Sequence, residues 1–211
     1  GDLSEPRLLN AYQNGIFPWF SDGQPILWWS PNPRMVFKTD AIRLSHKFRR
    51  QLRKSSWQIR VDTSFDQVIK QCAIVPRQGQ GGTWIHPEMI AAYCRLHRQG
   101  HAHSVEVFSE EKLIGGIYGV AIGRMFFGES MFSAQSGASK VALAGLGKIL
   151  HSWGWPLLDA QVENPHLQFM GAVFMPRAEF IEKLAHLCKL PEMPGLWSGR
   201  IAPFAATECL T

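Results

Sequence analysis

The sequence predicts an α/β protein of the α+β kind, in which one mixed sheet is covered by helices. Four helical patterns precede a run of alternating strands, and a helix, a short buried strand and two more helices follow that run. Hydrophobic residues make up 45% of the 211 residues and charged residues 18%. A chain of this length and composition can bury a packed core, so we expect one mid-sized domain with a small appendage.

The first 34 residues predict this appendage, a small N-terminal domain. A short helix follows Ser4 and ends near Gly15. Residues 16–34 hold four prolines and several aromatic residues, which predict an ordered loop lined with aromatic rings. Because the chain begins at Gly1 and not at a methionine, we expect the domain over residues 1–34 to be truncated.

Residues 35–211 form the predicted main domain, which begins with a basic helix. Asp40 is expected to cap a helix over residues 41–54, with Leu44, Phe48 and Leu52 on its buried face. This region carries the positive excess of the chain, since residues 41–60 contain seven basic and no acidic residues, and the net charge is +5. The pattern indicates either a surface that binds a polyanion or a solvated helix face.

The remaining elements follow from apolar periodicity and from residues that end helices. A helix follows Asp62, and Pro87 opens another that runs to Gln99. Strands are expected at 104–108, 113–122, 125–131 and 157–162, and helices at 138–152, after 164 and at 176–189. This order is similar to that of the acetyltransferase (GNAT) fold, a mixed sheet split open to admit a donor held on a carrier. A shared fold does not establish a shared function.

Motifs for cofactors and metals are weak in this sequence. Residues 78–82 approach the pyrophosphate loop of acetyl-CoA enzymes, but Thr83 stands where that loop has Gly or Ala. His97, His101 and His103 match no metal-binding spacing, and a helix C-terminus favours such cationic residues. We therefore expect no cofactor and no metal, and we keep an acetyl-CoA-dependent N-acyltransferase as the alternative function.

Cysteine usage and hydropathy bear on the cellular compartment. The four cysteines lie at positions 72, 94, 188 and 209 and form no Cys-x-x-Cys pair. Such spacing is typical of reduced thiols in a cytoplasmic protein. The sequence shows no signal-peptide pattern and no apolar run long enough to span a bilayer. It therefore predicts a cytoplasmic protein without a membrane partner.

Polar residues interrupt two otherwise apolar strands. Glu129 lies among Met and Phe residues, where an acid is either exposed by alternation or held for a cationic partner. Asp159, Gln161 and Glu163 share one face of the next strand, because side chains alternate along a strand. This row faces either solvent or a cleft, where a carboxylate beside an amide is suited to orienting an amine.

Several blocks of the sequence resemble the leucyl/phenylalanyl-tRNA–protein transferase family. The first blocks are Gly1–Ser4, Ala11–Gln13, Gly15–Phe20 and Pro25–Pro31. The later blocks are Gly82–Ile85, Gly100–Ser104, Gly115–Val120, Gly128–Ser133, Ala138–Lys140, and Asp159 with Gln161. They occur in order over nearly the whole chain and several contain tryptophan, so the chain is identified as a member of this family.

The resemblance implies an aminoacyltransferase. Members move Leu or Phe, and Met less well, from aminoacyl-tRNA to a protein that begins with Arg or Lys. The new N-terminal residue marks that protein for degradation under the N-end rule. The reaction needs no ATP, because an ester is converted into an amide.

The resemblance also implies roles for residues of this sequence. Asp159 and Gln161 correspond to the catalytic pair, which positions the acceptor amine and passes on its proton, and Glu129 to the counter-charge of the acceptor's Arg or Lys. The other residues fall into three groups. The terminal adenosine would contact Tyr12, Trp19, Trp84 and Tyr93. The aminoacyl side chain would contact Ile117, Phe126, Leu143, Leu146, Leu150 and Leu158. The tRNA phosphates would contact Lys47, Arg49, Arg50, Arg53 and Lys54.

Overall fold

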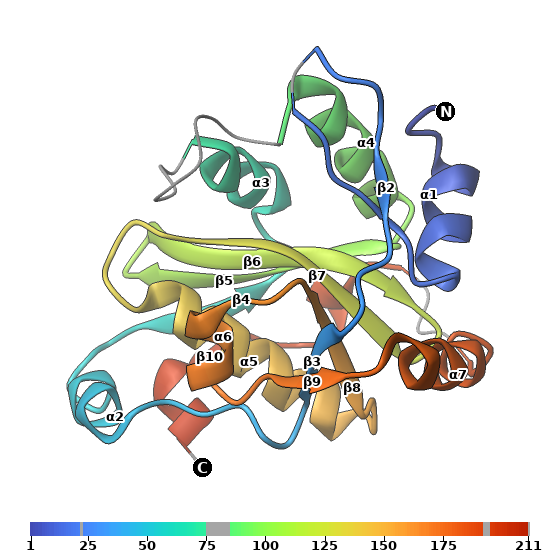
Figure 1. Ribbon diagram of the computed structural model, residues 1–211. Helices are drawn as coiled ribbons and strands as arrows, with labels where there is room; N and C mark the ends of the chain where they lie inside the picture. Colours follow the sequence, from blue (N-terminus) through green and yellow to red (C-terminus); the bar gives the residue numbers. More distant parts are fainter. Residues whose placement is uncertain (22, 75–84, 192–194, 211) are drawn as a thin grey trace.

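The computed structural model describes residues 1–21, 23–74, 85–191 and 195–210. Within these ranges the centre is an eight-stranded sheet in the order β10-β4-β5-β6-β7-β8-β3-β9 (Figure 1). Its strands are β3 (Arg34–Lys38), β4 (Gln58–Val61), β5 (Ala102–Ser109), β6 (Lys112–Ile122), β7 (Met125–Ser133), β8 (Leu157–Gln161), β9 (Val173–Met175) and β10 (Phe204–Ala205). A separate ribbon pairs β1 (Phe17–Pro18) with β2 (Trp28–Trp29).

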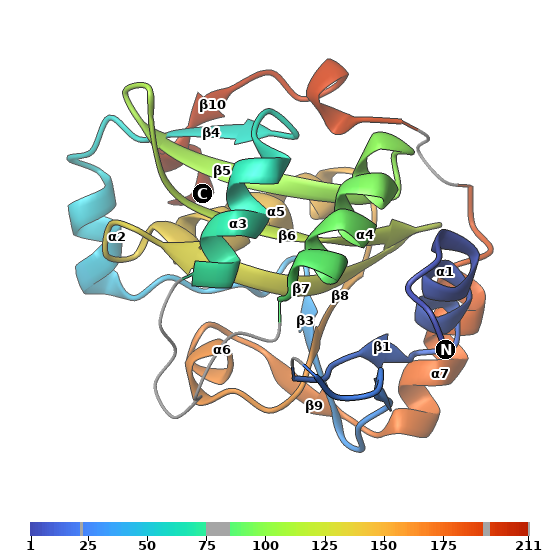
Figure 2. The ribbon, with the colours of Figure 1, turned by 90° about the horizontal axis from the view of Figure 1, so that it is seen from above.

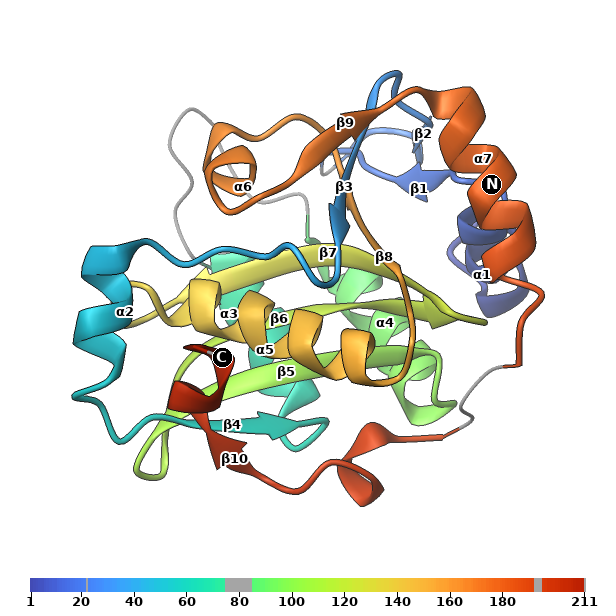
Figure 3. The same cartoon turned by 90° about the horizontal axis from the view of Figure 1, so that it is seen from below.

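Helices cover both faces of the sheet. One face carries α3 (Phe65–Ile74) and α4 (Pro87–Arg98), as Figure 2 shows, and the other carries α5 (Ala138–Ser152), as Figure 3 shows. The other helices are α1 (Glu5–Gln13), α2 (His46–Leu52), α6 (Pro165–Phe169) and α7 (Arg177–Leu187). Each face has its own apolar core, so the predicted mixed sheet covered by helices is confirmed. None of the helices in the described ranges is long and apolar enough to cross a membrane.

The sheet parts at its parallel pair, β7 and β8. The neighbouring pairs, β6 with β7 and β8 with β3, are antiparallel. The parallel pairing covers Met125 to Phe127 on β7 and Leu157 to Asp159 on β8. Past this point β7 continues beside β6 to Ser133, whereas β8 ends at Gln161. Side chains from both strands can therefore face a common space.

Helix α5 is apolar on nearly all sides because it lies at the centre of one core. Its buried residues extend from Ala138 to Leu150, and its small residues permit close packing. A Cβ atom on Gly145 would lie 2.6 Å from Ile59 Cδ1, so a larger residue there would require the Ile59 side chain to move. The observed bounds agree with the helix predicted over residues 138–152.

The helix predicted over residues 41–54 is shorter than expected. Its first turns are absent, and α2 is capped by Ser45 rather than by Asp40. The residues before Ser45 instead pack against the end of α6, where the Arg43 N–H donates to the Met170 carbonyl at 2.7 Å. This tertiary contact outweighs the local helical pattern. The strands β3, β4 and β9 were also not predicted, since none is longer than five residues.

Candidate active site

A cavity of about 800 Å³ lies where β7 and β8 part. Its walls come from β7, from the end of β8 and the chain that leads into α6, and from residues 17–19 of the N-terminal segment. The residues that the sequence analysis selected and that line this cavity are Trp19, Ile117, Glu129, Leu143, Leu158, Asp159 and Gln161. Glu129 and Asp159 thus belong to one site, as the resemblance implies.

One wall of the cavity is apolar. Ile117, Leu143 and Leu158 line it, together with Phe37, Met131 and Leu167, which the sequence analysis did not select. Three other predicted pocket residues, Phe126, Leu146 and Leu150, are buried in the core beside α5 and do not line the cavity. Phe126 lies where β7 and β8 are still paired, so the cavity begins beyond it. Only the first half of α5 reaches the cavity, through Leu143.

The opposite wall is acidic, and Glu129 is its centre. The Glu129 carboxylate accepts hydrogen bonds from the Tyr12 hydroxyl at 2.7 Å, the Tyr93 hydroxyl at 3.0 Å and Gln161 Nε2 at 2.7 Å. Burial raises the pKa of Glu129 from 4.5 to about 7, although these three hydrogen bonds lower it, and the negative charge of Asp159 adds to the rise. Glu129 can therefore gain or lose a proton near neutral pH.

Tyr12 and Tyr93 do not form the stacking surface that was expected. Both are completely buried, neither lines the cavity, and their hydroxyls contact each other as well as Glu129. Their rings pack on Phe127 and Tyr118 at centroid distances of 5.1 and 5.8 Å, so they have no free face for an adenine in this structure. Burial raises the pKa of both phenols well above 10, which keeps them as hydrogen-bond donors to Glu129.

Trp19 is the predicted stacking residue that does line the cavity. Its ring is half-buried and lies against Trp29, with centroids 6.0 Å apart, and Trp29 Nε1 donates to the Trp19 carbonyl at 2.7 Å. This contact holds the tryptophan within the Pro-rich segment. Trp84, the other predicted tryptophan, lies outside the described residues.

Asp159 and Gln161 face inward, and Glu163 does not. Asp159 is completely buried and Gln161 is 7% exposed, whereas Glu163 is exposed at the cavity rim. Asp159 and Gln161 therefore do not face solvent, which was one of the two alternatives for this row of residues. The Gln161 N–H donates to Asp159 Oδ1 at 2.9 Å, while its side chain donates to Glu129. Gln161 adopts φ +63°, a left-handed conformation that L residues rarely take.

Arg34 is a charged residue of this site that was not predicted from the sequence. Its guanidinium forms a buried ion pair with Asp159, which is 125 positions away in the chain. No local periodicity can indicate a contact of that separation. The sequence did indicate that Arg34 needs a partner. Arg34 precedes the apolar run Met35–Phe37, and a charged residue at the start of a buried strand has to be paired.

The basic residues of α2 and the turn after it form a separate surface. Lys47, Arg50, Arg53 and Lys54 are exposed, and none of them forms an ion pair with a described carboxylate. Arg49 differs, because it is half-buried and donates to the Leu210 carbonyl. Four of the five predicted phosphate-binding side chains are therefore available to an anionic partner.

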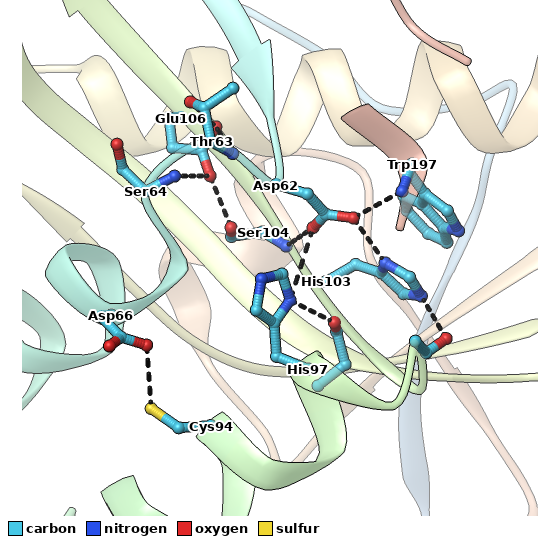
Figure 4. A network of polar contacts seen from close by, with 12 residues as sticks. Asp62, Thr63, Ser64, Asp66, Cys94, His97, His103, Ser104, Glu106 and Trp197 are labelled. Atoms are coloured by element: carbon cyan, nitrogen blue, oxygen red, sulfur yellow. Dashed lines mark hydrogen bonds and ion pairs between the residues drawn. The ribbon is translucent and has the colours of Figure 1, made fainter. Parts of the chain in front are cut away.

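Figure 4 shows a second buried polar cluster, which lies apart from the cavity and is centred on Asp62. Asp62 Oδ2 accepts the Trp197 N–H at 2.7 Å and contacts His103 Nδ1 at 2.8 Å, and His103 Nε2 lies 3.0 Å from the Gly100 carbonyl. The Trp197 ring stacks on His103 at a centroid distance of 3.8 Å. The cluster therefore fixes the C-terminal segment to β5.

Glu106 belongs to this second cluster, and its pKa is raised in the same direction as that of Glu129. Burial raises the pKa of Glu106 to about 7, although hydrogen bonds from Ser104 and Thr63 lower it. Among the described residues, no three His, Cys, Asp or Glu side chains are grouped so that they could hold a metal ion.

Comparisons with known proteins agree with this arrangement. The family model for the leucyl/phenylalanyl-tRNA protein transferase matches residues 36–185, and the model for the N-terminal domain of that transferase matches residues 1–32. A leucyl/phenylalanyl-tRNA–protein transferase of Xanthomonas oryzae pv. oryzae (strain MAFF 311018) is 64% identical over 208 residues, which cover 99% of this chain and 83% of that protein. The transferase of Xanthomonas axonopodis pv. citri (strain 306) is 67% identical over 200 residues, covering 95% and 80%.

Similarity to solved structures is much weaker. A functionally unknown conserved protein from Staphylococcus epidermidis ATCC 12228 is 9% identical with a TM-score of 0.47, over 83% of this chain and 66% of that one. The sequence relatives, by contrast, share most of their length with this chain at high identity. The chain therefore belongs to the leucyl/phenylalanyl-tRNA–protein transferase family, whose enzymes transfer an aminoacyl group from tRNA to a protein.

Proposed function

We propose that this enzyme moves Leu or Phe, and Met less well, onto proteins that begin with Arg or Lys, in the cytoplasm, and so marks them for degradation. The observation that carries the proposal is the pairing of two opposite walls in one cavity. An apolar wall around Leu143 suits the donated side chain, and an acidic wall around Glu129 suits a cationic N-terminal residue. The alternative, an acetyl-CoA-dependent acyltransferase, is not favoured, because the family model and the relatives described above are those of tRNA–protein transferases.

The apolar wall supports a donor with an apolar side chain. Ile117, Leu143 and Leu158 present aliphatic surface without a polar group that could select one side chain. Such a pocket discriminates between side chains that differ by one methylene by only about 1–3 kcal/mol. Leu, Phe and Met can therefore share it, and we propose that Trp19 stacks on the terminal adenine beside it.

The acidic wall supports an acceptor with a guanidinium or ammonium group. An ionised Glu129 would pair with that cation, because a charge-assisted hydrogen bond is strong where water is largely excluded. The amide of Gln161 already donates to Glu129 through Nε2, so its carbonyl oxygen is left to accept an N–H from the acceptor amine. Asp159 would act by holding Gln161 in this orientation.

The reaction then follows from proximity. The neutral α-amine attacks the ester carbonyl carbon, the new C–N bond replaces the bond to the ribose oxygen, and the proton lost by the amine goes to that leaving oxygen. An α-amine has a pKa of roughly 7.7–8.0, so an appreciable fraction is neutral at physiological pH. Orientation of the two substrates can therefore supply much of the rate.

The basic surface supports tRNA binding that does not depend on the base sequence. Exposed Lys47, Arg50, Arg53 and Lys54 would contact phosphates, and such contacts position a nucleic acid while base contacts select it. We also propose that residues 1–34 form a small domain beside a main domain over residues 35–211 that resembles the GNAT fold. The parting of the parallel strands β7 and β8 supports that resemblance.

A transfer assay tests the proposal. Phe-tRNA labelled on its amino acid is incubated with two peptides that differ only in their first residue, Arg or Gly. We expect label on the Arg peptide and little on the Gly peptide, with Glu129→Gln reducing transfer to the Arg peptide. Equal labelling of both peptides would contradict the assignment of the acidic wall.

A further inference from the structure

We propose that Arg34 is a positioning residue for aminoacyl transfer: it holds Asp159 as a fixed carboxylate and, through Asp159, orients Gln161 on the acidic wall. The inference rests on the proposed function, in which Gln161 and Glu129 seat the acceptor. It concerns a residue that would touch neither substrate.

The contact between Arg34 and Asp159 is bidentate and dry. Arg34 Nε donates to Asp159 Oδ1 at 2.8 Å and Nη2 donates to Oδ2 at 2.7 Å, and both side chains are completely buried. A guanidinium does not lose its proton in a protein, and its planar fork matches the two carboxylate oxygens. The carboxylate thus has a permanent counter-charge and a single orientation.

The guanidinium is itself held from three sides. Its Nη1 donates to the Gly15 carbonyl at 2.9 Å, and its Cζ lies 4.9 Å from the Phe17 ring centroid and 4.7 Å from that of Phe180. These partners come from the N-terminal segment and from α7. The position of Arg34, and through it the orientation of Asp159, therefore depends on how both elements pack. Asp159 itself lies on β8, between β7 and β3.

Asp159 passes this constraint on to Gln161. Oδ1 accepts both Arg34 Nε and the Gln161 N–H, so its two lone pairs are occupied. The bond to the Gln161 N–H supports the left-handed backbone of that residue, and this backbone directs the side-chain amide to Glu129. A series of directed hydrogen bonds therefore leads from Arg34 to the carboxylate that would bind the acceptor.

This geometry also limits what Asp159 can do. Oδ1 is saturated and Oδ2 accepts from Nη2, so a proton could reach only the remaining lone pair of Oδ2, beside the positively charged guanidinium. Asp159 thus serves as a fixed negative charge and not as a base that takes the amine proton. The chemistry then depends on Arg34 as much as on Asp159.

The test compares two substitutions at Arg34 with a matched control. Arg34→Lys keeps the charge but loses the fork, and Arg34→Gln leaves the buried carboxylate without a counter-charge. The control is Arg177→Gln, because Arg177 Nη1 donates to the Ser30 carbonyl at 2.8 Å and so ties the same N-terminal segment to α7 without contacting Asp159. The assay measures kcat, both KM values and the pH–rate profile with Phe-tRNA and the Arg peptide, and thermal unfolding reports the folded fraction.

We expect Arg34→Lys to lower kcat about 10- to 100-fold, since small displacements of positioning groups have effects of this size, with KM for Phe-tRNA nearly unchanged. For Arg34→Gln we expect a larger loss of kcat, again with KM for Phe-tRNA nearly unchanged, because the buried carboxylate then has neither its counter-charge nor its fixed orientation. Arg177→Gln should keep the wild-type kcat and pH–rate profile. A folded Arg34→Lys or a folded Arg34→Gln with wild-type kcat would overturn the proposal.

A further variant covers the case in which neither Arg34 substitution folds. Phe180→Leu keeps the charge and the ion pair but removes one of the two rings that orient the guanidinium. Its kcat should fall several-fold with KM for Phe-tRNA unchanged, and an unchanged kcat would then overturn the proposal. Wild-type enzyme in the same assay separates the two hypotheses, since a wild type that fails to transfer Phe contradicts the proposed function instead.

Discussion

The ionisation of Glu129 makes the stability of this enzyme depend on pH in a predictable direction. Its pKa rises from 4.5 to about 7 on folding, chiefly because it is buried. A carboxyl group whose pKa is raised contributes stability below its ordinary pKa and loses that stability as the pH rises through the folded value. A rise in pKa of this size corresponds to about 3 kcal/mol, and most of it falls between pH 5 and pH 8.

Glu129→Gln should remove this component, because glutamine does not titrate over that range. Urea unfolding at about pH 5 and about pH 8 would give the free energy of unfolding for wild type and variant. We expect the wild type to lose about 2–3 kcal/mol more than the variant over this interval. Equal pH dependence in both proteins would refute the reasoning, because it would mean that Glu129 is ionised throughout.

Glu106 provides the matched control, since burial raises its pKa to about 7 as well. Glu106→Gln should also flatten the pH dependence of stability, but it lies in the cluster around Asp62 and not at the cavity. KM for the Arg peptide should therefore fall through about pH 7 in the wild type and in Glu106→Gln, and only Glu129→Gln should lose that step. A loss of the step in both variants would place the titrating group elsewhere.

Three further perturbations follow from the site. Asp159→Ala leaves Arg34 buried without its counter-charge, so its unfolding free energy in urea should fall by about 3–5 kcal/mol. Lys54→Ala should weaken tRNA binding and reduce the slope of log affinity against log salt by about 1, as one phosphate contact is lost; an unchanged slope would remove Lys54 from the interface. Leu143→Ala enlarges the apolar wall, and transfer rates measured with Phe-tRNA and Leu-tRNA should shift towards Phe; an unchanged ratio would mean that the donated side chain lies elsewhere.

Local pattern was enough to predict much of this molecule. Helix α5 and strands β5 to β7 were predicted with nearly their observed bounds, because apolar periodicity and turn residues act over a few positions. The acids at 129 and 159 were recognised for the same reason, since a charge within an apolar strand is visible in the sequence itself. The family resemblance added their joint role, and the shared cavity agrees with it.

The sequence by itself determined which acidic residues stand within apolar strands, but only the tertiary structure decided how they are supported. Tyr12 and Tyr93 are aromatic in any fold, yet packing turns their rings inward and their hydroxyls to Glu129. Arg34 pairs with Asp159 because β3 enters the sheet beside β8. These contacts join residues 36 to 125 positions apart, and they depend on the path of the whole chain, which no local periodicity records.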